Sequence, residues 1–249
     1  MIDLHSHILP GLDDGPATAE ESLELARAAV ADGVDVIAAT PHVRDDWPTT
    51  PDAMETALER LRAAIAEAEI GLDVRPGGEL ALEHLSLPPE ELRRFGLGGS
   101  ATYLLVETPY VGWPLDIAER LFLLRAAGFT PVLAHPERNR DVQADPEARL
   151  GPLVAAGTLV QLTAASVDGR LGRRVRDASK RLLELGLAHL IASDAHTPAI
   201  RAVGMSAAAG AVGDGDLARW LTHDVPAAIV ADAAPPPRPE PRRKRRFFG

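Results

Sequence analysis

The sequence predicts an α/β protein built on a parallel sheet. Short apolar runs alternate with segments of helical periodicity, and most runs lie about 25–35 residues apart, a spacing typical of βα units. Glycines separate the helical segments from the following runs, where helices commonly end. Seven such units without a domain break predict a closed (βα)7 variant of the TIM barrel, and a doubly wound open sheet is the alternative.

The expected strands are short and mostly apolar. They are residues 2–5, 34–40, 72–79, 102–107, 130–135, 158–163 and 188–194. Two of the intervening helices have clear starts: Thr18 forms a capping box with Glu21, and Thr50 is an N-cap followed by Pro51. Apolar residues then recur at helical spacing, and residues 115–127 and 174–185 repeat this style.

Composition narrows the class of protein. The 249 residues are 46% hydrophobic, which permits a large core, and no apolar run approaches the roughly 18 residues of a membrane span. The first residues have no basic segment followed by an apolar one, so we expect a cytoplasmic protein. Cysteine is absent. This excludes disulfides, thiolate metal sites and a cysteine nucleophile.

Charge divides the chain into two parts. The last fifteen residues carry six basic residues and one acidic residue, so the rest of the chain holds a net charge of −15. An acidic body argues against a nucleic-acid groove. We expect one domain over residues 1–233, followed over 234–249 by a proline-rich spacer and a disordered basic tail.

Histidine and carboxylate side chains stand at the ends of six of the seven expected strands. His5 and His7 share one face of the first strand, because residues i and i+2 of a strand point the same way. The first loop can add Asp13 or Asp14. The other candidates are His42, Glu79, Glu107, His135, Asp194 and His196.

These candidates exceed the needs of one metal ion, so we expect two or three divalent ions. Mixed imidazole and carboxylate ligands suit Mn²⁺, Fe²⁺ or Zn²⁺. A bridging carboxylate such as Glu79 fits a multinuclear site. We interpret His84, His189 and His223 as structural or surface residues.

The motifs MIDLHSHILPGLDDGP, ATPH, GGE, VETP, AHPERNR and ASDAH resemble those of the polymerase-and-histidinol-phosphatase (PHP) superfamily. The chain is most similar to its CpsB/CapC branch of manganese-dependent protein-tyrosine phosphatases of bacterial capsule and exopolysaccharide synthesis. The resemblance covers residues 1 to about 233. It implies the PHP fold, a distorted (βα)7 barrel with three metals, and Mn²⁺ as the expected ion.

The resemblance also implies roles for single residues. His5, His7, Glu79 and Asp194 match ligands of a first metal, while Glu79, Glu107 and His135 match those of a second. Asp14, His42 and His196 match the third set. Arg138 and Arg201 match phosphate-holding positions. The implied substrate is a phosphotyrosine protein, a membrane-associated tyrosine autokinase of polysaccharide export.

The expected chemistry follows from such a site. A water bridging two metal ions supplies hydroxide near neutral pH, which attacks phosphorus in line. Arg138 and Arg201 can hold phosphoryl oxygens in bidentate fashion. The phenolate of phosphotyrosine leaves readily, with a pKa of about 10, and His42 or His196 can donate a proton through water.

Other functions stay open. A histidinol-phosphate phosphatase or an exonuclease would share the fold and metals, although the acidic body disfavours the exonuclease. An amidohydrolase also begins with His-x-His, but many bridge their metals with a strand-end lysine, and the lysines here are Lys180 and Lys244. A non-enzymatic metal-binding scaffold would need a broken ligand set. The tail RRKRRFFG predicts peripheral binding to an anionic membrane face, unless it is an inert terminus.

Overall fold

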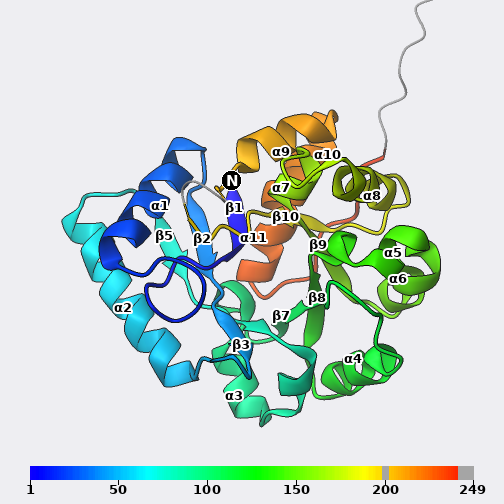
Figure 1. The fold of residues 1–249 in the computed structure, drawn as a ribbon, viewed down its shortest axis with the longest axis horizontal. Coiled ribbons are helices and arrows are strands. Elements are labelled where there is room, and N and C mark those ends of the chain that lie inside the picture. Colours follow the sequence, from blue (N-terminus) through cyan, green and yellow to red (C-terminus); the bar gives the residue numbers. More distant parts are fainter. Residues whose placement is uncertain (198–201, 241–249) are drawn as a thin grey trace, which may run out of the picture.

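The computed structural model describes residues 1–197 and 202–240, and strands and helices alternate along most of this chain (Figure 1). The strands are β1 (Ile2–Ser6), β2 (Val36–Ala39), β3 (His42–Arg44), β4 (Trp47–Pro48), β5 (Asp73–Arg75), β6 (Glu79–Leu80), β7 (Tyr103–Glu107), β8 (Thr130–Ala134), β9 (Leu159–Thr163) and β10 (Leu190–Ala192). The predicted mixed α/β class is confirmed.

Helices fill most of the connections between the strands. The α-helices are α1 (Ala19–Ala31), α2 (Pro51–Glu67), α3 (Pro89–Arg94), α4 (Ile117–Ala126), α5 (Arg140–Ala144), α6 (Pro146–Ala155), α7 (Ala164–Val167), α8 (Arg173–Glu184), α9 (Met205–Val212), α10 (Gly215–Arg219) and α11 (Val225–Val230). The 3₁₀ segments are η1 (Leu82–Ser86), η2 (Leu97–Gly99) and η3 (Pro136–Arg138), and η4 (Trp220–Asp224) is a π-helical segment.

The strands form two hydrogen-bonded sheets. One has the order β1-β2-β5, and the other has the order β10-β9-β8-β7-β6-β3-β4. All pairings are parallel except that of β3 with β4. The predicted parallel sheet is therefore present, but the ladders of the described residues do not close into one barrel. The closed (βα)7 barrel predicted from the sequence is not confirmed.

Proline and glycine explain where the sheets divide. The single strand expected over 72–79 is split into β5 and β6 by Pro76, Gly77 and Gly78, and Pro41 separates β2 from β3. Proline has no N–H to donate to a ladder. At the other side, an isolated parallel bridge joins Ser6 to Ala195, so the first strand still lies beside the end of β10.

The helix starts follow the sequence signals. The Thr18 hydroxyl accepts a hydrogen bond from the backbone N–H of Glu21 at 3.3 Å, and the Thr50 hydroxyl accepts one from Ala53 at 3.2 Å. The inner face of α2 buries Met54, Leu58, Leu61 and Ile65. Each such side chain contributes roughly 1.5–3 kcal/mol on burial.

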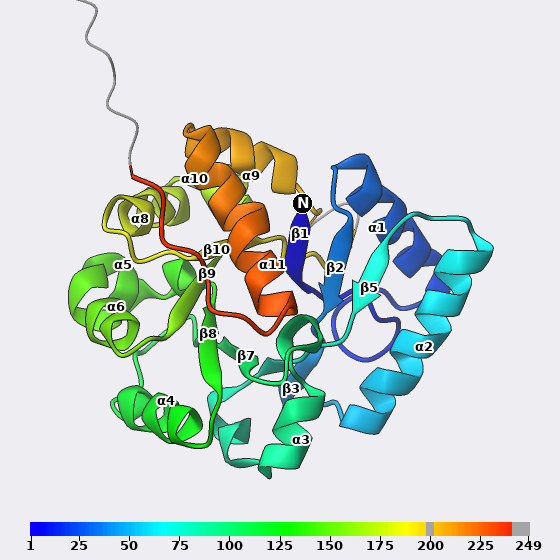
Figure 2. The same cartoon turned by 180° about the vertical axis from the view of Figure 1, so that it is seen from behind.

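The core lies around and between the strands. Every residue of β1 and β9 is buried, as expected for parallel strands covered on both faces. The helices surround the strands, and Figure 2 shows α11 crossing in front of them. Within the described part of the chain, no helix combines the length and apolar character needed to span a membrane.

Candidate metal centre

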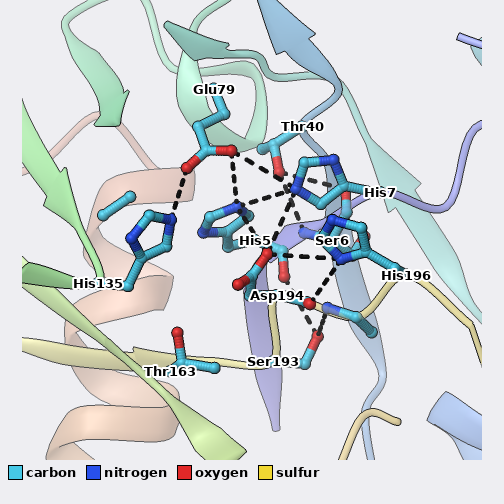
Figure 3. A network of polar contacts seen from close by, with 12 residues as sticks. His5, Ser6, His7, Thr40, Glu79, His135, Thr163, Ser193, Asp194 and His196 are labelled. Atoms are coloured by element: carbon cyan, nitrogen blue, oxygen red, sulfur yellow. Dashed lines mark hydrogen bonds and ion pairs between the residues drawn. The ribbon is translucent and has the colours of Figure 1, made fainter. Parts of the chain in front are cut away.

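The predicted metal ligands lie together, although His42 and Glu79 are the first residues of β3 and β6 and Asp14 lies in a loop. His42 and Glu79 are paired in register across β3 and β6, Glu107 ends β7, and His135 directly follows β8. Carboxyl ends of parallel strands meet at one edge, which brings residues distant in sequence into contact. Figure 3 shows the side chains of His5, His7, Glu79, His135, Asp194 and His196 facing one another.

The ligand atoms form three overlapping groups, in each of which they lie within 4.8 Å of one another. The groups are His7, Asp14, His42 and His196; His5, His7 and Glu79; and His42, Glu79 and Glu107. Two further predicted ligands contact these groups. His135 Nε2 lies 2.8 Å from Glu79 Oε1, and Asp194 Oδ1 lies 3.4 Å from Nε2 of both His5 and His7.

Two imidazoles point their Nε2 atoms at one another. His5 Nε2 and His7 Nε2 are 3.3 Å apart in a fully buried position. The Nδ1 of His5 faces Gln161 Oε1 at 3.0 Å, and the Nδ1 of His7 faces Asp13 Oδ2 at 2.7 Å. Because these oxygens accept hydrogen bonds, each Nδ1 is the donor, which leaves two Nε2 lone pairs converging. This arrangement fits a shared cation.

Hydrogen bonds behind the ligands fix their orientation. Asp13 Oδ2 also accepts the backbone N–H of His42 at 3.0 Å, so this carboxylate joins two ligand segments without belonging to a ligand group. Asp14 instead lies with its Oδ1 3.1 Å from His196 Nε2. Between the two candidates of the first loop, the geometry therefore places Asp14 at the ligand groups and Asp13 behind His7.

The electrostatics of the cluster favour bound positive charge. Burial alone would raise the pKa of Glu79, but His5, His135 and His42 hold it well below its usual range. Burial would lower the pKa of His5, but the charges of Glu79 and Asp194 outweigh this effect and raise it. Burial and the nearby Glu79 raise the pKa of Glu107. A cation bound among these buried carboxylates would balance their negative charge.

Two of these residues have left-handed backbone. His135 has φ of 40° and Asp194 has φ of 53°, whereas side chains other than glycine rarely adopt positive φ. His135 directly follows β8, and Asp194 lies two residues after the end of β10. The strained backbone aims these side chains back at the strand ends, as is common at functional sites.

Arg138, the residue predicted to bind phosphate, contacts the cluster through Asp194. Its Nη2 lies 2.6 Å from Asp194 Oδ2 and donates to the Thr163 hydroxyl at 2.8 Å. Its Nη1 faces the Tyr110 hydroxyl at 3.4 Å. The tyrosine ring stacks on His135, with centroids 5.6 Å apart. The second predicted arginine, Arg201, lies outside the described residues.

The residues that support the ligands were not predicted from the sequence. Gln161 lies in a strand that was expected from the sequence. The only sign of its role was that Gln161 and Thr163, two polar residues, share one face of β9. The remaining histidines are placed away from the ligand groups. His84 pairs with Asp45, His223 with Asp224, and His189 accepts the backbone N–H of Val160.

The fold and the site define an α/β protein in which histidines and carboxylates, most of them buried, form groups that could hold metal ions. Residues 1–224 match the family described as capsular polysaccharide synthesis, CpsB/CapC. The chain belongs to this family.

Named relatives and a solved structure agree with this assignment. Tyrosine-protein phosphatase YwqE of Bacillus subtilis (strain 168) is 39% identical over 199 residues, which cover 79% of this chain and 77% of the relative. Tyrosine-protein phosphatase CpsB of Streptococcus agalactiae serotype III is 30% identical over 210 residues, 81% of this chain and 85% of the relative.

The fold is also similar to a solved structure. Its description reads crystal structures of YwqE from Bacillus subtilis and CpsB from Streptococcus pneumoniae, unique metal-dependent tyrosine phosphatases. The TM-score is 0.86 at 32% identity, and the match covers 97% of this chain and 100% of that one. The distorted arrangement of split strands described above is therefore close to that of a known phosphatase structure.

Proposed function

We propose that this protein is a metal-dependent protein-tyrosine phosphatase of capsule or exopolysaccharide synthesis. The observation that carries the proposal is the cluster around Glu79, in which two ligand groups share one buried carboxylate. Membership of the CpsB/CapC family supports the substrate class. The named relatives do not favour the alternatives, a histidinol-phosphate type of phosphoesterase or an amidohydrolase.

Nine side chains would hold the metal ions. They are His5, His7, Asp14, His42, Glu79, Glu107, His135, Asp194 and His196. Mn²⁺ is the ion we expect, with Fe²⁺ or Zn²⁺ as alternatives, since the donor set mixes imidazole and carboxylate. When bound, such ions supply hydroxide near neutral pH and neutralise charge on the phosphoryl oxygens.

The chain's own residues position the substrate. The Arg138 guanidinium binds phosphoryl oxygens in its plane, and Asp194, Thr163 and Tyr110 hold that plane still. Arg201 is the second proposed phosphate-binding residue. A tyrosine phenolate is a good leaving group, with a pKa of about 10. His42 or His196 passes a proton to it through a water molecule.

We interpret the two sheets as a distorted (βα)7 barrel. Residues 40–41 carry the chain from β2 to β3, and residues 76–78 carry it from β5 to β6. The backbone N–H of Glu79 donates to the Pro41 carbonyl at 3.0 Å within this gap. Together with the bridge between Ser6 and Ala195, this contact supports a ring of strands that is opened by proline and glycine.

The proposed partner is a phosphorylated tyrosine kinase at the inner face of the membrane, which requires a cytoplasmic enzyme. Residues 1–233 form the proposed catalytic domain. The spacer is extended over 234–240 and lies on the body, where Arg238 donates to the Leu183 carbonyl at 2.7 Å and Trp220 donates to the Pro236 carbonyl at 3.0 Å. The basic residues from 241 onward lie outside the described residues. We propose that they contact anionic lipid.

The test compares a phosphotyrosine peptide with histidinol phosphate, each with added Mn²⁺ and with chelator. We expect metal-dependent turnover of the phosphotyrosine peptide and a much lower kcat/KM for histidinol phosphate. Vanadate should inhibit weakly, because no cysteine nucleophile is available. Activity that survives exhaustive metal removal would contradict the proposal, and preference for histidinol phosphate would favour the alternative.

A further inference from the structure

A groove of about 610 Å³ lies beside the ligand cluster. Glu107 and Tyr110 line this groove and also belong to the cluster or contact it. Its other walls come from the turn after β3, from η1 and from the loop that leads to α4. Leu82 and Pro114 give it an apolar surface. The groove is therefore continuous with the position where the phosphate of a substrate would bind.

The side chain of Tyr110 lies between the cluster and the groove. One side of its ring stacks on His135 at an interplanar angle of 20°, while 45% of the residue remains exposed. The loop carrying Tyr110 is held by the buried Asn139. The Asn139 amide donates to the carbonyls of Pro109 at 2.6 Å and Gly112 at 2.9 Å. The aromatic ring of a substrate whose phosphate lies at the cluster would contact Tyr110.

Among the described residues that line the groove, acidic side chains outnumber basic ones. The two basic side chains of this set are already paired: Arg44 binds Asp46 and Glu107, and Arg120 binds Asp116. Those partners also line the groove.

Two further acids, Asp45 and Glu83, add charge beyond these pairs. The Asp45 carboxylate lies 3.3 Å from His84 Nε2, and its side chain is 89% exposed. Glu83 is also exposed.

We propose that this groove binds the peptide residues that flank the phosphotyrosine and selects substrates with lysine or arginine there. The inference rests on the proposed phosphatase function and names its substrate class. Asp45 and Glu83 supply the charge complementarity, and Tyr110 supplies the contact for the tyrosine ring. Complementary charges at a solvent-exposed rim change mainly the rate at which substrate associates and the KM, and added salt weakens this effect.

The experiment uses two phosphotyrosine peptides of equal length, one with lysines and one with glutamates on both sides of the phosphotyrosine. With the Mn²⁺-loaded full chain at low salt, we expect roughly tenfold higher kcat/KM for the lysine peptide, seen mainly in KM. The preference should shrink in 0.5 M NaCl. In Asp45→Lys/Glu83→Lys the preference should disappear or invert, whereas Asp45→Glu/Glu83→Asp should retain it.

A matched double reversal on the outer helix α2, Glu59→Lys/Glu67→Lys, changes net charge equally without touching the groove and should keep the preference. p-Nitrophenyl phosphate serves as the internal reference for each protein. Equal kcat/KM for both peptides with the unmodified protein would overturn this inference, as would a preference that survives Asp45→Lys/Glu83→Lys. Failure to hydrolyse any aryl phosphate with metal present would instead overturn the proposed function.

Discussion

Arg138 and Asp194 are ion-paired, with Nη2 2.6 Å from Oδ2. The pair joins a predicted phosphate-binding group to a predicted metal ligand, and both side chains are almost fully buried. Burial would raise the pKa of Asp194, but His5 and Arg138 hold it well below its usual range. The position of the guanidinium is thus fixed relative to the ligand cluster, as a phosphate-binding residue requires.

Arg138→Lys should lower kcat/KM for an aryl phosphate by about 10²-fold while metal content stays near that of the unmodified protein. A lysine keeps the charge but loses planar, two-point binding of phosphoryl oxygens. Metal analysis beside steady-state kinetics decides the case. Loss of metal in this variant would assign Arg138 to holding Asp194 rather than to binding substrate.

His135→Ala and Asp194→Ala should each lower kcat by at least about 10²-fold, because each removes a proposed ligand at the strand ends. Circular dichroism should show a folded protein, since the core lies around the strands beneath the cluster. His223→Ala is the control, because His223 is exposed and pairs only with Asp224 among the described contacts. Near-normal rates for the two variants in metal-replete buffer would place the site elsewhere.

Asp13→Asn and Asp14→Asn should behave differently. Asp13 accepts a hydrogen bond from the Nδ1 of His7. Replacing its carboxylate by the amide of asparagine should therefore lower metal affinity by roughly 10–100-fold, yet leave activity recoverable at high Mn²⁺. Asp14→Asn removes a ligand charge beside His196 and should lower kcat even at saturating metal. Titration of activity with Mn²⁺ separates the two effects. The same residual kcat for both variants at saturation would contradict the division of roles.

Most residues of the ligand cluster were predictable because the sequence places them at or just after the ends of expected strands. The carboxyl ends of parallel strands converge in any βα array, so His42, Glu107 and His135 could be grouped without knowing the closure of the sheet. The choice between Asp13 and Asp14 was not predictable in this way. Adjacent residues in a loop can face opposite directions, and only the packing against His7 and His196 decides which one meets the cluster.

The closure of the sheet could not be derived from residue patterns. The run 72–79 reads as one strand, but Pro76 lacks the N–H that a ladder needs, and Gly77 approaches Thr40 closely. Supporting residues such as Gln161 and Tyr110 also escaped prediction. Their roles depend on contacts between segments far apart in the sequence, and neither residue type signals such a role by itself.

His189 should make the fold sensitive to acid. Its pKa is lowered to about 4, because burial disfavours the charged ring and Arg238 adds a like charge. An unfolded histidine has a pKa of about 6.5. Below that pH the unfolded chain binds a proton that the folded protein excludes. The stability contributed by neutral His189 is therefore complete above about pH 6.5 and is lost as the pH falls toward 4.

Urea unfolding at pH 7.5 and pH 5 measures this contribution. His189→Asn keeps an acceptor near the backbone N–H of Val160 but cannot be protonated. Between the two pH values, the free energy of unfolding should fall by up to about 2 kcal/mol more in the unmodified protein than in the variant. An identical pH dependence for both proteins would show that His189 is not buried in its neutral form.

Deleting residues 241–249 should weaken binding to anionic vesicles and leave aryl phosphate hydrolysis unchanged. The deletion removes five consecutive basic residues and two phenylalanines, but keeps Arg238 on the Leu183 carbonyl. Each basic residue near an anionic bilayer contributes roughly 1 kcal/mol, so the loss should be large at low salt and small at high salt. Sedimentation with phosphatidylserine-containing vesicles measures it, with phosphatidylcholine vesicles as the reference.

A second variant separates charge from apolar contact in this tail. Replacing Arg242, Arg243, Lys244, Arg245 and Arg246 by glutamine keeps Phe247 and Phe248. If charge drives binding, this variant should sediment like the deletion, because the acidic body is repelled by the same lipid and two aromatic residues alone anchor weakly. Equal sedimentation of the full chain and the deletion at low salt would contradict membrane binding. The tail would then be inert or would bind an acidic protein.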